Sequence, residues 1–162
     1  MKVLVYGMPR TCTTVCCQLL SQSLALPNLL EQYASIRQQQ NRQAADDFLQ
    51  SQNQYVAKIL TIDCLNKNHF RYEPFPWHWA DRVVITSREN YTHQICSDYF
   101  AREVAKYSKP MNSLDELAQW REFLKTITIT VPLEYINKGS LVDHQRIFRE
   151  GCEHIRSIHP NS

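Results

Sequence analysis

The chain has 162 residues, of which 43% are hydrophobic and 21% charged, and its formal net charge is +2. This length and composition predict a single globular domain, residues 1–162, with a substantial core. The net charge is too small to favour nucleic acid or a membrane surface as a partner. No apolar run approaches the roughly 18 residues of a membrane-spanning helix, and the run at residues 3–6 is too short for a signal peptide.

The six cysteines follow no zinc-ligand spacing and contain no C-x-x-C pair. Cys16 and Cys17 are adjacent within a predicted helix, which is a poor arrangement for a disulfide framework. We therefore expect free thiols in a reducing compartment, a cytoplasmic protein and no bound metal.

The first elements in chain order are a strand, a tight loop and a helix. Residues 2–6 form a short apolar run that is typical of a buried parallel strand. Residues 7–12 predict a loop, and residues 13–24 carry apolar side chains at helical spacing. Pro27 and Asn28 then interrupt the chain.

The middle of the chain contains two further strand candidates, at residues 55–62 and 82–87. Residues 33–53 are rich in glutamine and predict a surface helix or a mobile cover. Residues 66–79 combine aromatic side chains with two prolines, which indicates a loop or a short helical turn. The aromatic side chains either line a ligand pocket or stack on a sugar, or they pack in the core.

The last part of the chain predicts mainly helices. Residues 90–107 have helical spacing, Ser113 and Glu116 form a capping box for another helix, and residues 143–158 predict a polar final helix. Residues 127–131 alternate with threonine in a β-like pattern. The alternation of strands and helices predicts an α/β fold in three layers, with a mainly parallel central sheet flanked by helices.

Residues 7–14, which read GMPRTCTT, lie between the first predicted strand and the first predicted helix. The start of a helix presents unpaired N–H groups and a partial positive charge, so it attracts phosphate. Arg10 adds a cation, and Thr13 and Thr14 add hydroxyl donors. The alternative interpretation is an ordinary strand-to-helix turn with a threonine cap.

A comparison with the nucleotide-binding pattern G-x-x-x-x-G-K-[ST] narrows the kind of phosphate site. Gly7 and Thr14 match its ends, whereas Cys12 replaces the second glycine and Thr13 replaces the lysine. The lysine is the cation that reaches the β- and γ-phosphates, so its loss argues against an ATP or GTP hydrolase.

Residues 9–14, PRTCTT, resemble the 5′-phosphosulfate loop of sulfotransferases, which has the pattern P-[KR]-[ST]-G-T-T. The resemblance implies a P-loop-like fold and a co-substrate, 3′-phosphoadenosine 5′-phosphosulfate. At Cys12 the family usually has glycine, and we expect helical dihedral angles there, which a cysteine tolerates. The implied co-substrate-binding residues of this loop are Pro9, Arg10, Thr11, Cys12, Thr13 and Thr14.

A second resemblance concerns Arg88, at the end of the third predicted strand, and Ser97, on the following helix. An arginine and a serine so placed hold the 3′-phosphate in the sulfotransferase family. The guanidinium offers a bidentate fork to phosphate oxygens, and the serine adds a neutral hydrogen bond. The alternative roles are a salt-bridge partner and a plain helix residue. Together the two motifs extend the resemblance over residues 2–107.

The transfer step needs a cation at the transferring group and a base for the acceptor proton. The resemblance implies Arg10 as that cation, with Lys58 adding to it from the second strand, although a strand-end lysine often simply reaches solvent. Glu31 follows the first helix, where many carbohydrate and protein sulfotransferases carry a glutamate base. The histidines at positions 69, 78 and 93 are alternative bases, because the cytosolic small-molecule sulfotransferases use a histidine.

The sequence names no acceptor, so a small molecule and a carbohydrate both stay open, as does a homo-oligomer. Three candidates for the family's C-terminal basic loop are Lys138, Arg146 and Arg149. Two rival functions remain, a P-loop kinase of a small metabolite and a non-catalytic nucleotide-binding relative. The missing lysine opposes the kinase, and Cys12 favours the non-catalytic relative.

Overall fold

The computed structural model describes residues 1–30, 32–61, 65–66, 69–70, 76–104, 118–119, 122, 125–126, 128, 130–136 and 139–161. The chain divides into two compact units. The first combines residues 1–88 with residues 140–162, and the second comprises residues 89–139.

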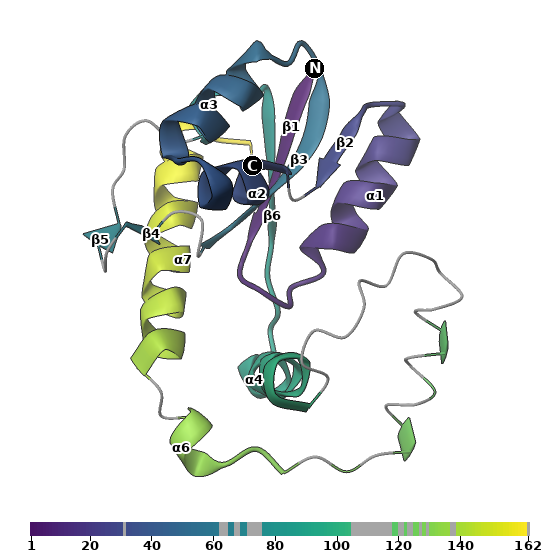
Figure 1. The fold of residues 1–162 in the computed structure, drawn as a ribbon, viewed down its shortest axis with the longest axis vertical. Coiled ribbons are helices and arrows are strands. Elements are labelled where there is room, and N and C mark those ends of the chain that lie inside the picture. The colour runs from purple at the N-terminus through teal and green to yellow at the C-terminus, as the bar shows by residue number, and fades with distance from the viewer. Residues whose placement is uncertain are drawn as a thin grey trace. The chain divides into compact units, whose positions relative to one another are not determined.

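A four-stranded parallel sheet forms the centre of the first unit, in the order β2-β3-β1-β6 (Figure 1). The expected parallel sheet is thereby confirmed. At its carboxyl end, Gly7 lies opposite Leu60 on one side and Thr86 on the other. The strands are β1 (Lys2–Gly7), β2 (Asn28–Leu30), β3 (Tyr55–Leu60) and β6 (Arg82–Thr86).

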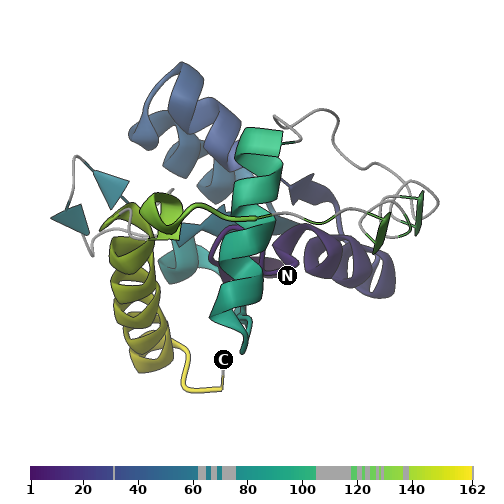
Figure 2. The ribbon, with the colours of Figure 1, turned by 90° about the horizontal axis from the view of Figure 1, so that it is seen from below.

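Helices pack on both faces of this sheet, so the α/β prediction also holds. In Figure 2, α1 and α7 lie on opposite sides of the strands. The helices of the first unit are α1 (Thr13–Leu24), α2 (Gln32–Gln39), α3 (Arg42–Ser51) and α7 (Gly139–Ile158). It also holds the short antiparallel pair β4 (Leu65–Asn66) and β5 (His69–Phe70) and the 3₁₀ turn η2 (Pro76–Trp79).

Three details differ from the sequence prediction. The interruption expected at Asn28 is the start of the edge strand β2. The long helix expected at residues 33–53 is two helices, because Asn41 begins a new one by accepting a hydrogen bond from the Ala44 N–H at 2.9 Å. The last helix begins at Gly139 rather than residue 143.

Strand residues of alternating parity supply two separate cores. One face of the sheet packs against α2, α3 and α7, and its core includes Leu4, Tyr6 and Ile59. The other face packs against α1 and includes Val5 and Cys17. The face under α7 is held close, because a Cβ on Gly151 would lie 2.8 Å from Cζ of Tyr6.

The second unit contains α4 (Tyr91–Tyr99), the π-helical turn η3 (Phe100–Val104) and α6 (Leu133–Ile136). The expected helix at residues 90–107 is thus confirmed over its described part. The start of the helix expected from Ser113 lies outside the described residues. Residues 128, 130 and 131 belong to no strand, so the β-like pattern there does not form one where it is described.

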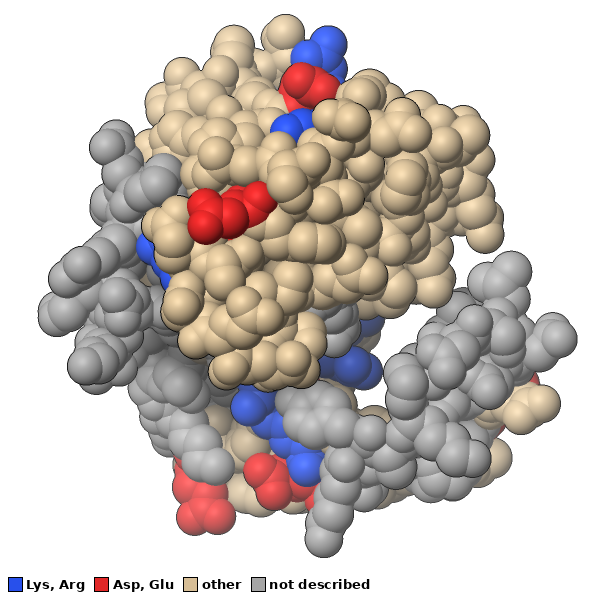
Figure 3. Space-filling model, turned by 45° about the horizontal axis from the view of Figure 1, so that its top comes forward, with Lys and Arg blue, Asp and Glu red and all other residues tan. Residues whose placement is uncertain are grey.

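None of the helices in the described ranges is long and apolar enough to cross a bilayer. Charged side chains are interspersed with uncharged ones on the face drawn in Figure 3.

Candidate functional site

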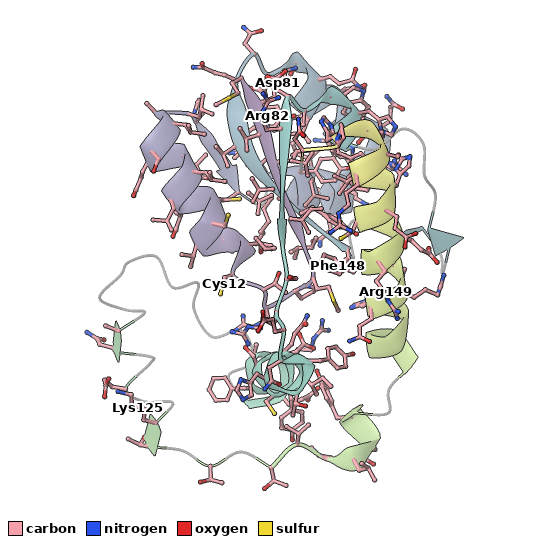
Figure 4. All side chains as sticks on the ribbon, turned by 180° about the vertical axis from the view of Figure 1, so that it is seen from behind. Cys12, Asp81, Arg82, Lys125, Phe148 and Arg149 are labelled. Atoms are coloured by element: carbon pink, nitrogen blue, oxygen red, sulfur yellow. The ribbon has the colours of Figure 1, made fainter. Side chains whose placement is uncertain are left out.

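The loop that follows β1 lies at the carboxyl end of the sheet, between the ends of β3 and β6. The chain passes from β1 to β2 and β3 on one side and later places β6 on the other side of β1. In open parallel sheets such a reversal of strand order creates a crevice at the carboxyl ends, where ligands bind. Figure 4 shows Cys12 at this end of the sheet, whereas Asp81 and Arg82 lie at the opposite end.

Gly7 is required at the end of β1 because three side chains crowd its Cα. A Cβ at this position would lie 2.6 Å from Thr11 Oγ1 and 2.7 Å from Thr13 Cγ2, and it would also collide with Thr86 Oγ1. Contacts this short do not occur for real Cβ atoms, so no other residue fits without moving the loop. The role of Gly7 is therefore close approach rather than a positive φ.

Hydroxyl groups fix the loop to the neighbouring strand. Thr11 Oγ1 donates to the carbonyl oxygen of Met8 at 2.7 Å, and it lies 3.1 Å from Thr86 Oγ1. Thr86 Oγ1 in turn donates to the carbonyl oxygen of Tyr6 at 3.4 Å, so both threonine hydroxyls bond to the backbone around Gly7. Thr11 is only 4% exposed, so these bonds are shielded from water and tie the loop to β6.

Two non-glycine residues of the loop have left-handed backbone conformations. Arg10 has a φ of 67° and Cys12 a φ of 61°. The expected helical dihedral angles at Cys12 are therefore wrong: Cys12 is the N-cap, one residue before the helix, and its ψ is 20°. The physical reason is the sharp turn from β1 into α1, which needs αL conformations that glycine adopts at lower cost.

The amino end of α1 has no side-chain cap and no acidic residue in its first turn. By contrast, α3 is capped by Asn41 and α4 by Asn90, each through a side-chain oxygen that accepts a backbone N–H. The first N–H groups of α1 consequently keep their hydrogen-bonding capacity, and the helix dipole adds a partial positive charge there. This arrangement suits an anion.

Lys58 brings a buried cation to the first turn of α1. It lies in the middle of β3, it is only 5% exposed, and its Nζ donates to Thr14 Oγ1 at 3.1 Å. The alternative of a strand-end lysine reaching solvent is therefore excluded. An ammonium withdrawn from water interacts more strongly with a nearby anion than an exposed one does.

The thiol of Cys17, one turn further along α1, also lies within the field of Lys58. Burial and the neighbouring Cys16 raise the pKa of Cys17 to about 12, and Lys58 opposes this rise. Cys17 therefore stays a neutral thiol at physiological pH. The positive charge of Lys58 near the amino-terminal half of α1 is therefore not offset by the Cys17 thiol.

The remaining loop residues differ in exposure. Thr13 is 4% exposed, while Pro9 and Thr14 are partly buried. The two exposed side chains are Arg10 and Cys12, the residues with positive φ. The structure thus brings Thr11, Thr13, Thr14 and Lys58 together around the loop, and leaves Arg10 at its surface.

Other predicted residues are not brought to this loop by the described contacts. Arg88 is exposed after β6 and is the last residue before the chain enters the second unit. Ser97 lies on α4, which belongs to the second unit. The predicted pair is thus divided between the two units. Glu31, Lys138 and the side chain of His69 lie outside the described residues.

The two other candidate bases have described positions. His78 belongs to η2, where its ring lies 5.3 Å from that of His154, and His93 is in the first turn of α4. Of the basic-loop candidates, Arg146 pairs with Glu150 at 3.1 Å and Arg149 is exposed on α7 (Figure 4).

Thr86 is a site residue that sequence analysis missed. It ends β6, and its hydroxyl contacts both Gly7 and Thr11 across the sheet. The available signal was a polar residue at the end of a strand that neighbours the glycine loop. This signal becomes meaningful only once β6 is known to lie beside β1. Spacing along the chain does not reveal that pairing.

In the described part of the chain, no three His, Cys, Asp or Glu side chains gather in a way that could hold a metal ion. A comparison of the chain with protein-family models, with curated proteins and with solved structures found no match. The geometry at the carboxyl end of β1 is therefore the basis for any functional proposal.

Proposed function

We propose that this chain is a sulfotransferase with a P-loop-like, three-layer fold. It would transfer a sulfuryl group from 3′-phosphoadenosine 5′-phosphosulfate to a hydroxyl or amine of an acceptor. The observation that carries the proposal is the uncapped start of α1, which the buried ammonium of Lys58 reaches at Thr14. Open N–H groups, hydroxyls and a desolvated cation together favour the phosphosulfate end of the donor.

In the proposed reaction the acceptor oxygen or nitrogen attacks sulfur, and the bond from sulfur to the 5′-phosphate oxygen breaks. The leaving adenosine 3′,5′-bisphosphate takes the electron pair, so negative charge grows on its 5′-phosphate. The amide groups at the start of α1 and Lys58 stabilise that charge, and Arg10 adds an exposed cation at the surface of the loop. Glu31 takes the acceptor proton.

The 3′-phosphate of the donor would bind Arg88 and Ser97, as in the resembled family. This assignment depends on the sequence resemblance, because the two residues belong to different units. It is the part of the proposal that is most easily tested separately. Arg88→Ala should weaken the binding of adenosine 3′,5′-bisphosphate. It should leave the affinity for adenosine 5′-phosphosulfate nearly unchanged, because that compound lacks the 3′-phosphate.

The central experiment is a calorimetric titration with adenosine 3′,5′-bisphosphate in the absence of divalent metal, followed by the same titration on Lys58→Met. Removing a buried cation should leave the free protein folded and of similar stability. The affinity should fall by about tenfold or more, because a charge-assisted contact is lost.

The matched control is Lys2→Met, which removes a lysine from the amino end of the adjacent strand, where Lys2 Nζ donates to the Gln50 carbonyl at 3.0 Å. It should leave the affinity unchanged. Binding of ATP with magnesium but not of the bisphosphate would refute the proposal in favour of a kinase. Bisphosphate binding without transfer to any acceptor would indicate a non-catalytic nucleotide-binding relative.

A further inference from the structure

Trp77, in the turn η2, is held by a histidine of α7. Trp77 is 0% exposed, and its indole Nε1 donates a hydrogen bond to His154 Nδ1 at 3.1 Å. Its ring packs in the same core as Cys152 and Ile155 of α7. An indole N–H can only donate, so the nitrogen that faces it carries a lone pair and no proton. His154 is therefore bound here as the neutral tautomer, with its proton on Nε2.

The His154 ring is only half-buried, so a proton from solvent can reach it. Because Nε2 already carries a proton, Nδ1 is the one ring nitrogen that can take up a second. Protonation of His154 and the bond from Trp77 therefore exclude each other. A protonated His154 would leave the buried indole N–H without this acceptor, a loss that folded proteins avoid.

A second histidine holds the same tryptophan in a way that acid does not disturb. His159 Nε2 lies 2.8 Å from the carbonyl oxygen of Trp77. A carbonyl only accepts, so Nε2 of His159 is the donor, and both the neutral and the protonated ring can donate from it. Acid therefore keeps this backbone contact of Trp77 and removes the side-chain contact to His154.

Three other titratable side chains of the described residues lie close to His154. The centroid of the His78 ring is 5.3 Å away, so a positive charge on His78 repels one on His154. On α7, Glu150 precedes His154 by four residues and pairs with Arg146 at 3.1 Å, and Glu153 is exposed. A carboxylate favours a charged histidine, but it does not change which nitrogen takes the second proton. The bond from Trp77 is lost whichever neighbour dominates.

We propose that Trp77 and His154 form an acid-sensitive latch, which holds the carboxyl-terminal half of α7 on the sheet at neutral pH and releases it in mild acid. A histidine in an unfolded chain takes up a proton near pH 6.5, to about half. Folded His154 resists that proton as long as it accepts the indole bond. The unfolded state therefore binds more protons below this pH, and stability falls as the pH falls.

The latch packs against the strand that leads into the phosphate loop. The Trp77 ring meets the Tyr6 ring edge-on, with centroids 5.4 Å apart, and Phe148 of α7 stacks on the same Tyr6 ring at 5.6 Å. Tyr6 directly precedes Gly7, where the loop begins. We therefore expect release of the latch to weaken anion binding at the loop. This last consequence rests on the proposed function, whereas the latch itself does not.

The experiment follows the indole N–H of Trp77 by NMR, on the full ¹⁵N-labelled chain between pH 8 and pH 5. The chain has three tryptophans, and the variants Trp79→Phe and Trp120→Phe assign the other two indole signals. We expect the Trp77 signal to move as His154 Nδ1 takes up its proton, which the ¹⁵N shift of that nitrogen reports. Protection of the indole N–H from hydrogen exchange, corrected for the intrinsic rate at each pH, should fall by about tenfold or more.

The decisive variant is His154→Asn. The asparagine oxygen lies about where Nδ1 does, so it accepts the indole bond but takes up no proton. The Trp77 signal of this variant should not depend on pH in this range. The folding equilibrium constant of the native chain should fall more steeply in acid than that of the variant, by up to about tenfold per pH unit. In the matched control, His78→Asn, the transition should remain and move to higher pH, because the neighbouring positive charge is gone.

The proposal is overturned if the Trp77 signal is the same at pH 8 and pH 5, or if His154 Nδ1 already carries a proton at pH 8. It is also overturned if the native chain and His154→Asn respond to acid alike. The Nδ1 measurement uses the native chain, so it decides the question even if His154→Asn does not fold.

The link to the loop is measured separately, as the affinity for adenosine 3′,5′-bisphosphate at pH 7.5 and pH 5.5. Acid should weaken binding by the native chain more than binding by His154→Asn. Equal weakening would show that the latch does not reach the loop. Failure of the nucleotide to bind at either pH would refute the proposed function and leave the latch to the NMR result.

Discussion

The two helices α1 and α4 each follow a strand of the same sheet, yet their amino ends are built in opposite ways. Before α4, the side chain of Asn90 accepts a hydrogen bond from the His93 N–H at 3.0 Å and so caps the amino end of the helix. Before α1, Cys12 adopts a left-handed conformation and offers no cap. The first amide groups of α1 therefore lack the side-chain cap that α4 has, as the proposed anion site requires, and this lack costs stability that α4 keeps.

We expect the largest effect on the loop before α1 from Gly7→Ala. The new methyl group would collide with three threonine side chains, so we expect the free energy of unfolding to fall by about 3 kcal/mol. Binding of adenosine 3′,5′-bisphosphate should be lost as well. Denaturant unfolding and a binding titration at low temperature measure the two effects.

Gly151→Ala is the control for this prediction. Its methyl group would press on the ring of Tyr6, and a Cβ there would lie 3.1 Å from Cε1. The variant should be destabilised to a similar degree, but its folded fraction should still bind the bisphosphate. Equal loss of binding in both variants would mean that Gly7 acts through stability alone.

Asn90→Ala tests the other side of the comparison. Loss of an asparagine N-cap typically costs about 1 kcal/mol, so α4 should unfold locally more often. Faster amide hydrogen exchange in the first turn of α4, with unchanged exchange in α1, is the expected result. Unchanged exchange in both helices would show that the cap has no energetic role.

Cys12→Gly tests whether the left-handed conformation at the start of α1 costs stability. Glycine adopts a φ near 60° without the steric cost of a Cβ, so the variant should gain about 1 kcal/mol of stability. Its bisphosphate affinity should not fall, because the backbone amides keep their places. A lower melting temperature would contradict the strain inferred at Cys12.

The smallest effect concerns thiol chemistry along α1. Cys12 is exposed, whereas Cys17 is buried and its pKa is raised to about 12. Alkylation by iodoacetamide at pH 8 should therefore modify Cys12 first and leave Cys17 untouched in the folded protein. Adenosine 3′,5′-bisphosphate should slow the modification of Cys12. Equal rates with and without this nucleotide would place the anion elsewhere.

The sequence pattern predicted the strand, loop and helix around Gly7 because apolar periodicity and a glycine before a threonine pair are local signals. The conformation of Cys12 was mispredicted, since dihedral angles in a tight turn depend on where the flanking strand and helix are held. The contact from Lys58 to Thr14 depends on β3 lying beside β1, a non-local pairing. Thr86 was missed for the same reason.

The helical segment at residues 33–53 shows a different limit of sequence reasoning. High glutamine content favours helix throughout, and the break before Asn41 becomes visible only through its capping bond. The edge strand β2 has three residues, too few for any alternation to be recognised. Short elements of this kind are formed by their neighbours rather than by their own composition.

The close contact between α7 and β1 has a consequence for how the polypeptide acquires its structure. The hydroxyl of Tyr6 donates to the Ile147 carbonyl at 3.5 Å, and the Phe148 ring stacks on the Tyr6 ring, although about 140 residues separate these partners along the chain. Such distant pairings make folding slow. We therefore expect the face of β1 that packs against α7 to stay uncovered during synthesis until α7 has been made, which favours aggregation in the meantime.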